Sequence, residues 1–325
     1  MFSIVKEGRG NKLGLFVQFF WNIPFCGVNK HVWEKVCYID ETYIYLFLKK
    51  NRQEMNYQYI VPPAYLRDYV EYFWTLDSTK GQSDPLKFAT IADGSPGLIF
   101  QVSSNGFAYQ GEKQLPTVYL YGQTTTCSQI LLPSSFQTIG VYFYPHALKS
   151  IFGLDAWELT DNCLDIRLFS TLKEYNLIER LLNLSDVSQR IEVLGSYLYK
   201  LIVLHNSRVD DKVKYTLANI KNMRKNLPLT HLRQDLGWSE RTLERKFKEQ
   251  VGISPKLFTK ITQFQMALNL LRSENYNRLT DVAYENFYAD QSHFIRSFKE
   301  FTSLTPNQYL KNSKELVVNF PQIFI

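Results

Sequence analysis

The sequence predicts an α+β protein of more than one domain, in which a β-rich N-terminal part precedes an all-α C-terminal part. Three observations predict this. Residues 56–165 contain short runs of β-branched and aromatic residues between turn clusters. From about residue 146 the apolar spacing becomes helical. In the last third, one helical pattern occurs twice at a constant offset of 51 residues. A chain of 325 residues is long enough for two separate cores.

The β-rich part is expected to span residues 55–165. Its strands are predicted at "GLIFQVSS", "TVYLYG" and "FQTIGVYFYP", between the turn clusters "DGSPG", "SSNG" and "LPSS". The segment "PAYLRDYVEYFW" is different, because Leu66, Tyr69, Val70 and Phe73 have helical spacing and predict an amphipathic helix. Asp93 and the following glycine predict a turn with a structural role. The alternative is that they line the rim of a ligand pocket.

The next part of the chain predicts helices at "PHALKSIFG", "LKEYNLIERLLNL" and "DVSQRIEVLGSYLYKLIVLH". We interpret residues 166–211 as a helical linker, and 167–205 as the natural candidate for a dimer interface. The polar segment "NSRVDDK" at 206–212 is the best boundary before the basic last third.

Charge is distributed unevenly along the chain. From Arg208 to Glu315 there are 19 Lys and Arg against 12 Asp and Glu, whereas the remainder has 18 against 19. The last third therefore carries the whole net charge of +6, which favours a polyanionic partner there. A solvated helix surface is the ordinary alternative.

The first 54 residues show little periodicity and end at "NRQE", directly before Met55. Our hypothesis is that translation starts at Met55; a genuine, β-rich extension is the alternative. The apolar run at 13–28 contains Gln18, Asn22 and Pro24 and is too short and broken to span a membrane. Residues 313–325 are interpreted as a C-terminal tail.

The four cysteines form neither a CxxC pair nor a zinc-binding spacing, and are Cys26, Cys37, Cys127 and Cys163. Reduced thiols in a cytoplasmic protein are the simple interpretation.

The repeat aligns "LRQDLGWSERTLERKFKEQVGISPKLF" (232–258) with "VAYENFYADQSHFIRSFKEFTSLTPNQYL" (282–310). The matched positions are Ser239 with Asp290, Leu243 with Phe294, Arg245 with Arg296, Phe247 with Phe298, and Ser254-Pro255 with Thr305-Pro306. Each copy predicts a short helix, a tight turn and a second helix, which is a helix–turn–helix.

In the first copy, Gly237 supplies the turn and Ser239 the N-cap of the second helix. Leu243 and Phe247, at i and i+4, predict its buried face. The opposite face then carries Arg241, Glu244, Arg245 and Lys248. An arginine can bond bidentately to guanine and a glutamate can accept from cytosine, so this face suits a DNA major groove.

In the second copy, Asp290 is predicted to cap the helix, and three phenylalanines, Phe294, Phe298 and Phe301, to form its buried stripe. The polar start and outer face comprise Gln291, Ser292, His293, Arg296 and Lys299. Thr305 and Pro306 open a third, bracing helix. Residues 254–273, between the copies, predict a helix of about 30 Å, close to the 34–36 Å of one turn of B-DNA.

These residues resemble the AraC family of bacterial transcription regulators. "SERTLERKFKEQVGISPK" and "DQSHFIRSFKEFTSLTPNQYL" match the family's two helix–turn–helix signatures, and the resemblance covers about 212–312. Residues 59–165 also resemble a sensor domain of unknown ligand, through "PPAYLRDYVEYFWTL", "ADGSPGLIFQV", "YLYGQTT" and "IGVYFYPHALKSIFGL". The resemblance implies a cupin-like sensor, a homodimer, double-stranded promoter or operator DNA, a small-molecule effector and contact with RNA polymerase.

The chain departs from the family pattern at three positions. Phe287 and Ser303 stand where the family has glycine, and Gln263 where it has arginine. If the turn at Phe287 keeps a positive φ, the strain is about 1 kcal/mol.

The candidate DNA contacts are Ser239, Arg241, Thr242, Glu244, Arg245, Lys248, Gln291, Ser292, His293, Arg296 and Lys299. For the repeated arginines the alternative is an intradomain salt bridge, and for Glu244 an ordinary helix-surface pair with Lys248. His293 has a packed surface position as its alternative.

The sequence does not indicate an enzyme, a cofactor or a metal site. The five histidines are scattered, and neither a glycine-rich phosphate loop nor GxSxG occurs. The alternative to a DNA-binding regulator is a ligand-binding or protein-interaction scaffold whose helical module no longer binds DNA.

Overall fold

The structure, a computed structural model, describes residues 55–78, 86–171, 173–206, 209–222, 229–312 and 317–318. The hypothesis that translation starts at Met55 concerns residues 1–54, which lie outside the described residues, as does most of the expected tail. We use "N-terminal region" for the described residues up to 206 and "C-terminal region" for residues 209–312.

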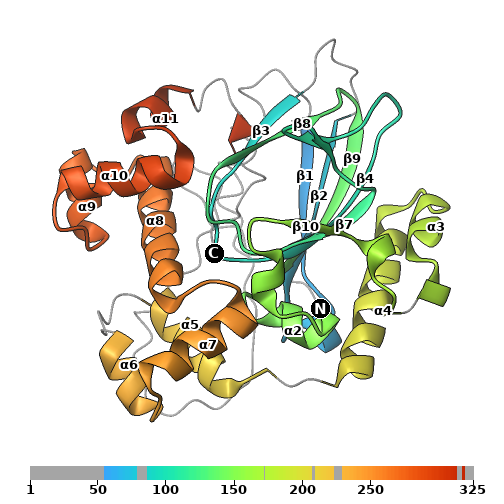
Figure 1. The fold of residues 1–325 in the computed structure, drawn as a ribbon. Helices are drawn as coiled ribbons and strands as arrows, with labels where there is room; N and C mark the ends of the chain where they lie inside the picture. Colours follow the sequence, from blue (N-terminus) through green and yellow to red (C-terminus); the bar gives the residue numbers. More distant parts are fainter. Residues whose placement is uncertain are drawn as a thin grey trace, which may run out of the picture. The chain divides into compact units, whose positions relative to one another are not determined.

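The N-terminal region supplies the strands of two sheets (Figure 1), except for β11, the edge strand of the second, which comes from residues 317–318. The order of the first is β1 (Met55–Ile60), β2 (Val70–Ser78), β9 (Phe136–Phe143), β4 (Gly97–Val102), β7 (Val118–Tyr121) and β10 (Cys163–Asp165). The second follows the order β11 (Val317–Val318), β3 (Leu86–Thr90), β8 (Ser128–Leu132), β5 (Tyr109–Gln110) and β6 (Lys113–Gln114). Pairing is antiparallel except between β11 and β3. The predicted β-rich N-terminal part is therefore confirmed.

The prediction of an amphipathic helix at "PAYLRDYVEYFW" is wrong. Only Ala64–Leu66 form a short 3₁₀ turn (η2), and the chain then enters strand β2 at Val70. This strand lies between β1 and β9, and successive side chains alternate between two buried environments. Tertiary pairing on both sides therefore outweighs the local helical spacing, which is common for aromatic and β-branched segments.

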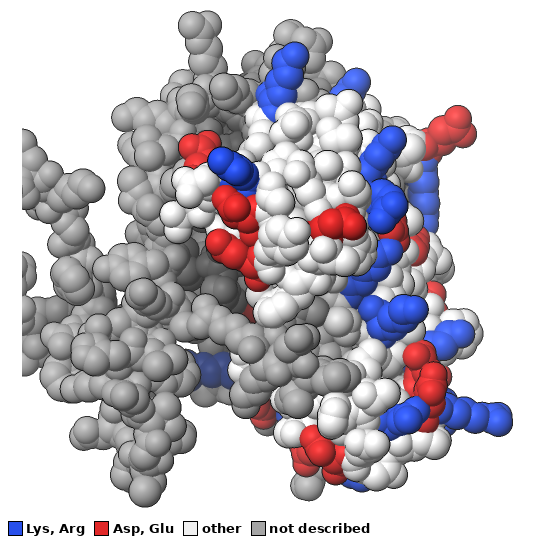
Figure 2. All heavy atoms as spheres, turned by 90° about the vertical axis from the view of Figure 1, so that its left-hand side faces the viewer, with Lys and Arg blue, Asp and Glu red and all other residues white. Residues whose placement is uncertain are grey.

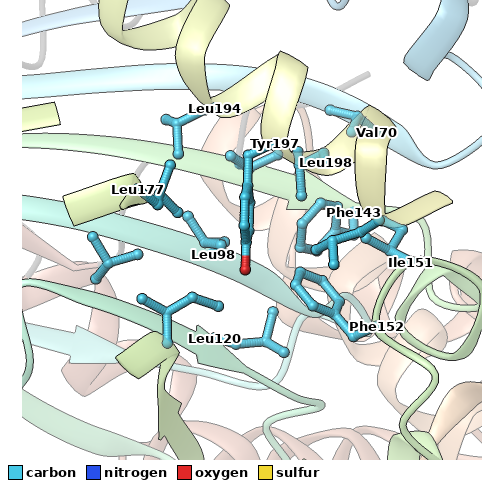
Figure 3. Close-up of a cluster of buried hydrophobic side chains, with 14 of the residues drawn as sticks. Val70, Leu98, Leu120, Phe143, Ile151, Phe152, Leu177, Leu194, Tyr197 and Leu198 are labelled. Atoms are coloured by element: carbon cyan, nitrogen blue, oxygen red, sulfur yellow. The ribbon is translucent and has the colours of Figure 1, made fainter. Parts of the chain in front are cut away.

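One face of the first sheet is covered by the helices α2 (Ala147–Phe152), α3 (Leu177–Leu182) and α4 (Val187–His205). Figure 3 shows this core, in which Leu98, Leu120 and Phe143 from the strands meet Phe152 and Tyr197 from the helices. Short 3₁₀ segments, η3 (Ala156–Leu159), η4 (Ile166–Leu168) and η5 (Lys173–Tyr175), connect these elements.

The opposite face of the first sheet is aromatic. Tyr72, Trp74 and Tyr119 belong to a second buried cluster with Phe88 and Leu132 from the other sheet. Tyr72 and Tyr142 stack with ring centroids 4.8 Å apart. The period-2 alternation of the strands thus supplies two cores from one sheet.

His146, directly before α2, is buried, and burial together with the charge of Lys214 lowers its pKa from 6.5 to about 4. Because the unfolded chain binds this proton at higher pH, the contribution to stability is full above pH 6.5 and falls as pH drops toward 4. We expect wild type to lose about 1 kcal/mol of unfolding free energy from this group between about pH 7.5 and about pH 5.5.

The variant His146→Phe keeps a ring for the stack on Tyr144 but cannot titrate. Urea unfolding at both pH values should show a flatter pH profile for this variant than for wild type. Equal slopes in the two proteins would contradict the assignment.

The C-terminal region is all-α, as predicted. Its helices are α5 (Asp211–Lys221), α6 (Leu229–Asp235), α7 (Glu240–Val251), α8 (Pro255–Ser273), α9 (Leu279–Glu285), α10 (Gln291–Thr302) and α11 (Pro306–Asn312). Helices α6 and α7 form the first helix–turn–helix, and α9 and α10 the second. Their shared core contains Phe247, Phe258, Phe264, Phe298 and Phe301, all nearly inaccessible to solvent.

Two residues that replace the family's glycines adopt the left-handed backbone region. Phe287 has φ 62° in the turn between α9 and α10, and Ser303 has φ 61° at the C-cap of α10. A side chain in this region costs about 1 kcal/mol relative to glycine.

Ser303→Gly is therefore expected to raise the free energy of unfolding by about 1 kcal/mol, since the exposed serine side chain contributes little packing. Ser292→Gly, in the first turn of α10, should instead lower it, by up to about 0.5 kcal/mol. Urea unfolding of both variants checks the sign, and a destabilised Ser303→Gly protein would contradict the prediction.

Candidate nucleic-acid interface

The turn and cap of the first helix–turn–helix fix where α7 begins. Gly237 has φ 62°, a conformation that a side chain would strain. The hydroxyl of Ser239 then accepts a hydrogen bond from the backbone N–H of Thr242 at 3.2 Å and lies 2.9 Å from the Thr242 hydroxyl. The Ser239 side chain thus caps α7, as predicted.

The side chains of α7 separate into two faces. Leu243 and Phe247 are buried. The residues of the opposite face are all exposed, and are Arg241, Glu244, Arg245 and Lys248. A helix with one apolar face fixed in the core and a charged face in solvent can be presented to a groove without disturbing the fold.

In the second helix–turn–helix, a carboxylate oxygen of Asp290 accepts from the backbone N–H of His293 at 2.6 Å and caps α10. Ser292, Arg296 and Lys299 are exposed. Gln291 and His293 are half-buried, and the His293 ring meets that of Tyr288 edge-on at 5.2 Å. His293 therefore combines a packing contact with a position in the first turn.

Helix α8 connects the two units and packs on both of them. Its 19 residues give a length of about 28 Å. Phe258 contacts Phe247 of α7, and Phe264 contacts Phe298 and Phe301 of α10, with ring centroids 5.0–6.0 Å apart. The predicted connecting helix thus has an aromatic contact with α7 and with α10.

Gln263, which replaces the family's arginine, lies on α8 and donates to the backbone carbonyl of Asn286 at 2.9 Å. Asn286 is buried, and its own amide donates to the carbonyl of Val282 at 2.8 Å. These bonds fix the backbone directly before Phe287, which supports the strained turn.

The charged candidates have intramolecular partners that sequence reasoning only partly anticipated. Arg245 donates to a carboxylate oxygen of Glu249 at 2.8 Å. The alternative pair of Glu244 with Lys248 is not formed within the described part of the chain, and the Lys248 ammonium lies 5.4 Å from the Trp157 ring instead. Glu249 was missed, although its match to Glu300 at the same offset of 51 was a visible signal.

Figure 2 shows the side of the molecule that faces left in Figure 1. Most Lys and Arg side chains visible there gather along one edge, with acidic groups between some of them. Such a mixed but basic surface can meet a phosphate backbone while acidic groups orient individual cations.

Within the described residues, no group of three or more His, Cys, Asp and Glu side chains is placed to hold a metal ion. None of the helices there is long and apolar enough to cross a membrane.

Comparison with protein families assigns both parts of the chain. Residues 58–165 match a domain of unknown function, and residues 232–312 match a helix–turn–helix domain. Among curated proteins, an uncharacterized HTH-type transcriptional regulator of Staphylococcus aureus is 32% identical over 146 residues, 44% of this chain and 19% of the relative. The regulator YtdP of Bacillus subtilis, also uncharacterized, is 23% identical over 191 residues. The match covers 57% of this chain and 23% of YtdP. The chain thus spans about a fifth of the length of these relatives.

Solved structures include two similar proteins. ToxT of Vibrio cholerae is 14% identical with a TM-score of 0.42, covering 74% of this chain and 98% of its own. The C-terminal domain of AraT, a response regulator of Geobacillus stearothermophilus, is 24% identical with a TM-score of 0.31. The match covers 36% of this chain and 95% of the AraT domain.

Proposed function

We propose that this chain, whose helix–turn–helix domain is of the AraC type, is a transcription regulator that binds specific double-stranded DNA. Helices α7 and α10 enter successive major grooves on one side of the duplex. The contacts come from the eleven candidate residues predicted above, with Arg245 and Arg296 as the principal base-reading side chains.

The observation that carries this proposal is the equivalence of the two recognition helices. Arg245 and Arg296 occupy matched positions, and both are exposed while their neighbouring phenylalanines are buried. The connecting helix of about 28 Å, together with its packing contacts, suits a spacing of one turn of B-DNA.

The N-terminal region is proposed to act as a sensor or oligomerisation domain that binds a small effector. The aromatic cluster between the sheets suits an apolar or planar molecule. A homodimer through residues 167–205 is supported by the exposed apolar side chains of α4, Tyr199, Val203 and Leu204. Such a dimer would present four recognition helices to paired sites, and RNA polymerase is a further proposed partner.

The proposed function is tested by selecting duplexes from a random-sequence pool with the purified full chain. Recovered duplexes are then tested by gel shift with heparin as competitor, beside the DNA upstream of the gene. We expect a consensus with two conserved segments and binding that survives heparin. Recovery of no consensus, with all shifts abolished by heparin, would favour the alternative of a protein-interaction scaffold.

A further inference from the structure

The two recognition helices share an arginine–glutamate pattern. Glu249 follows Arg245 by four residues, and Glu300 follows Arg296 by four, so the repeat preserves both charges. At this spacing on a helix, the two side chains are neighbours and can form an ion pair. The repeat therefore predicts the same local contact in both helices.

The structure gives the two glutamates different partners. Glu300 is met by the ammonium group of Lys260, from α8 of the same region, at 2.5 Å. Glu249 instead accepts from Arg245 at 2.8 Å, and its second oxygen lies 3.8 Å from the ammonium of Lys149. Lys149 belongs to α2 and also pairs with Asp155 at 2.7 Å, so the lysine beside Glu249 comes from the N-terminal region, whereas the lysine beside Glu300 comes from the C-terminal region.

The contact between Lys149 and Glu249 is part of a larger junction at the end of α7. The hydroxyl of Thr160 donates to the carbonyl of Gly252 at 2.9 Å. A Cβ at Gly252 would lie 2.9 Å from the backbone oxygen of Ala156, and φ is 98° there, so only glycine fits without strain. The backbone of η3 thus touches the C-cap of α7, which holds Lys149 within reach of Glu249.

Glu249 is suited to orient the Arg245 guanidinium. Its carboxylate takes one terminal nitrogen of Arg245, while the Arg245 side chain remains 57% exposed. A guanidinium has five donors, so one edge remains for guanine while another is held. Fixing the plane of the group favours the bidentate geometry that distinguishes guanine from the other bases.

From these contacts we infer that Glu249 is a positioning residue for Arg245 and that Lys149 links it to the N-terminal region. Base discrimination by α7 therefore depends on docking of the N-terminal region, whereas Glu300 at α10 is held from within the C-terminal region. A signal that displaces α2 changes specificity in one half of the recognition sequence. This inference rests on the proposed DNA-binding function.

The test measures fluorescence anisotropy of the full chain with a duplex recovered by the selection above, with each of its base pairs substituted in turn, and with an unrelated duplex. Glu249→Gln is expected to reduce discrimination at one base pair under α7 about 3- to 10-fold. Its affinity for the unrelated duplex should be equal or higher, because a negative charge is removed. A merely structural loss would weaken binding to both duplexes.

Lys149→Met should reduce discrimination at the same base pair about 2- to 4-fold and have no further effect in the Glu249→Gln background. Asp155→Asn is the matched control on the N-terminal side, because it removes the 2.7 Å pair with Lys149 but leaves Glu249 in place. Lys260→Met is the control for the second helix and should alter only base pairs under α10. Thermal melts establish that every variant is folded.

Unchanged discrimination in both Glu249→Gln and Lys149→Met would overturn the inference, as would an undiminished Lys149→Met effect in the double variant. Either result leaves the proposed function intact as long as wild type prefers its selected duplex. A wild-type chain that prefers no duplex overturns the proposed function and the inference together.

Discussion

Replacing Arg245 by Ala should weaken binding to the selected duplex by about 1–3 kcal/mol, which is about 5- to 150-fold, and should relax preference at one base pair. The side chain is exposed on α7, opposite the buried Leu243 and Phe247, so its removal leaves the core unchanged. The lost energy is that of a bidentate contact with a base edge.

The matched control for Arg245→Ala is Lys248→Ala, one turn further along the same face. A phosphate contact carries no sequence information, so this variant should weaken all duplexes about equally and lower the salt slope by about one. Binding titrations at several salt concentrations separate the two effects. If neither variant changed affinity at fixed salt, the assignment of α7 to a groove would be wrong.

Replacing Phe264 by Ala should cost about 3–5 kcal/mol of unfolding free energy. This fully buried ring is on α8, with centroids 5.5 Å from Phe298 and 5.0 Å from Phe301 of α10. Truncation therefore leaves a cavity where the connecting helix holds the second recognition helix, and sequence-specific binding should be lost with it. Urea unfolding and duplex binding measure the two consequences.

Phe264→Leu is the control for this prediction, because it keeps most of the apolar volume and should cost less than about 1.5 kcal/mol. Its binding to the selected duplex should remain close to wild type. An Ala variant as stable as the Leu variant would show that α8 does not hold α10 through this ring.

The sequence predicted the C-terminal region well because its signals are local. Ser239, Asp290 and Thr305 were predicted as caps, and each side chain accepts a hydrogen bond from the backbone N–H three positions further along the chain. The buried phenylalanines follow from helical spacing alone. Repetition of the pattern then distinguishes this module from a single helix–turn–helix.

Prediction from the sequence failed where contacts between distant segments of the chain determine the local structure or the partner of a side chain. Val70 and Phe73 have helical spacing, yet pairing with β1 and β9 makes the segment a strand. The local pair of Glu249 with Arg245 could have been read from the i, i+4 spacing, but its contact with Lys149 could not, because Lys149 is about a hundred residues away in the chain. No local pattern indicates that a lysine on α2 meets a glutamate on α7.

The turn at Phe287 was predicted only in part. The comparison with glycine at this position predicted strain, and the structure has φ 62° there. What the sequence did not indicate is the support of the turn by Gln263, whose bond to the carbonyl of Asn286 comes from α8. Gln263, one of the three departures from the family pattern, thus contacts the turn that contains Phe287, another of them.

The central claim is that two equivalent helices read neighbouring grooves on one side of the duplex. Hydroxyl-radical footprinting of wild type, Arg245→Ala and Arg296→Ala on one selected duplex measures this directly. We expect each variant to lose protection over a separate segment, with the two segments about 10–10.5 base pairs apart on the same side of the duplex. Loss of the same segment in both variants, or of segments on opposite sides, would contradict it.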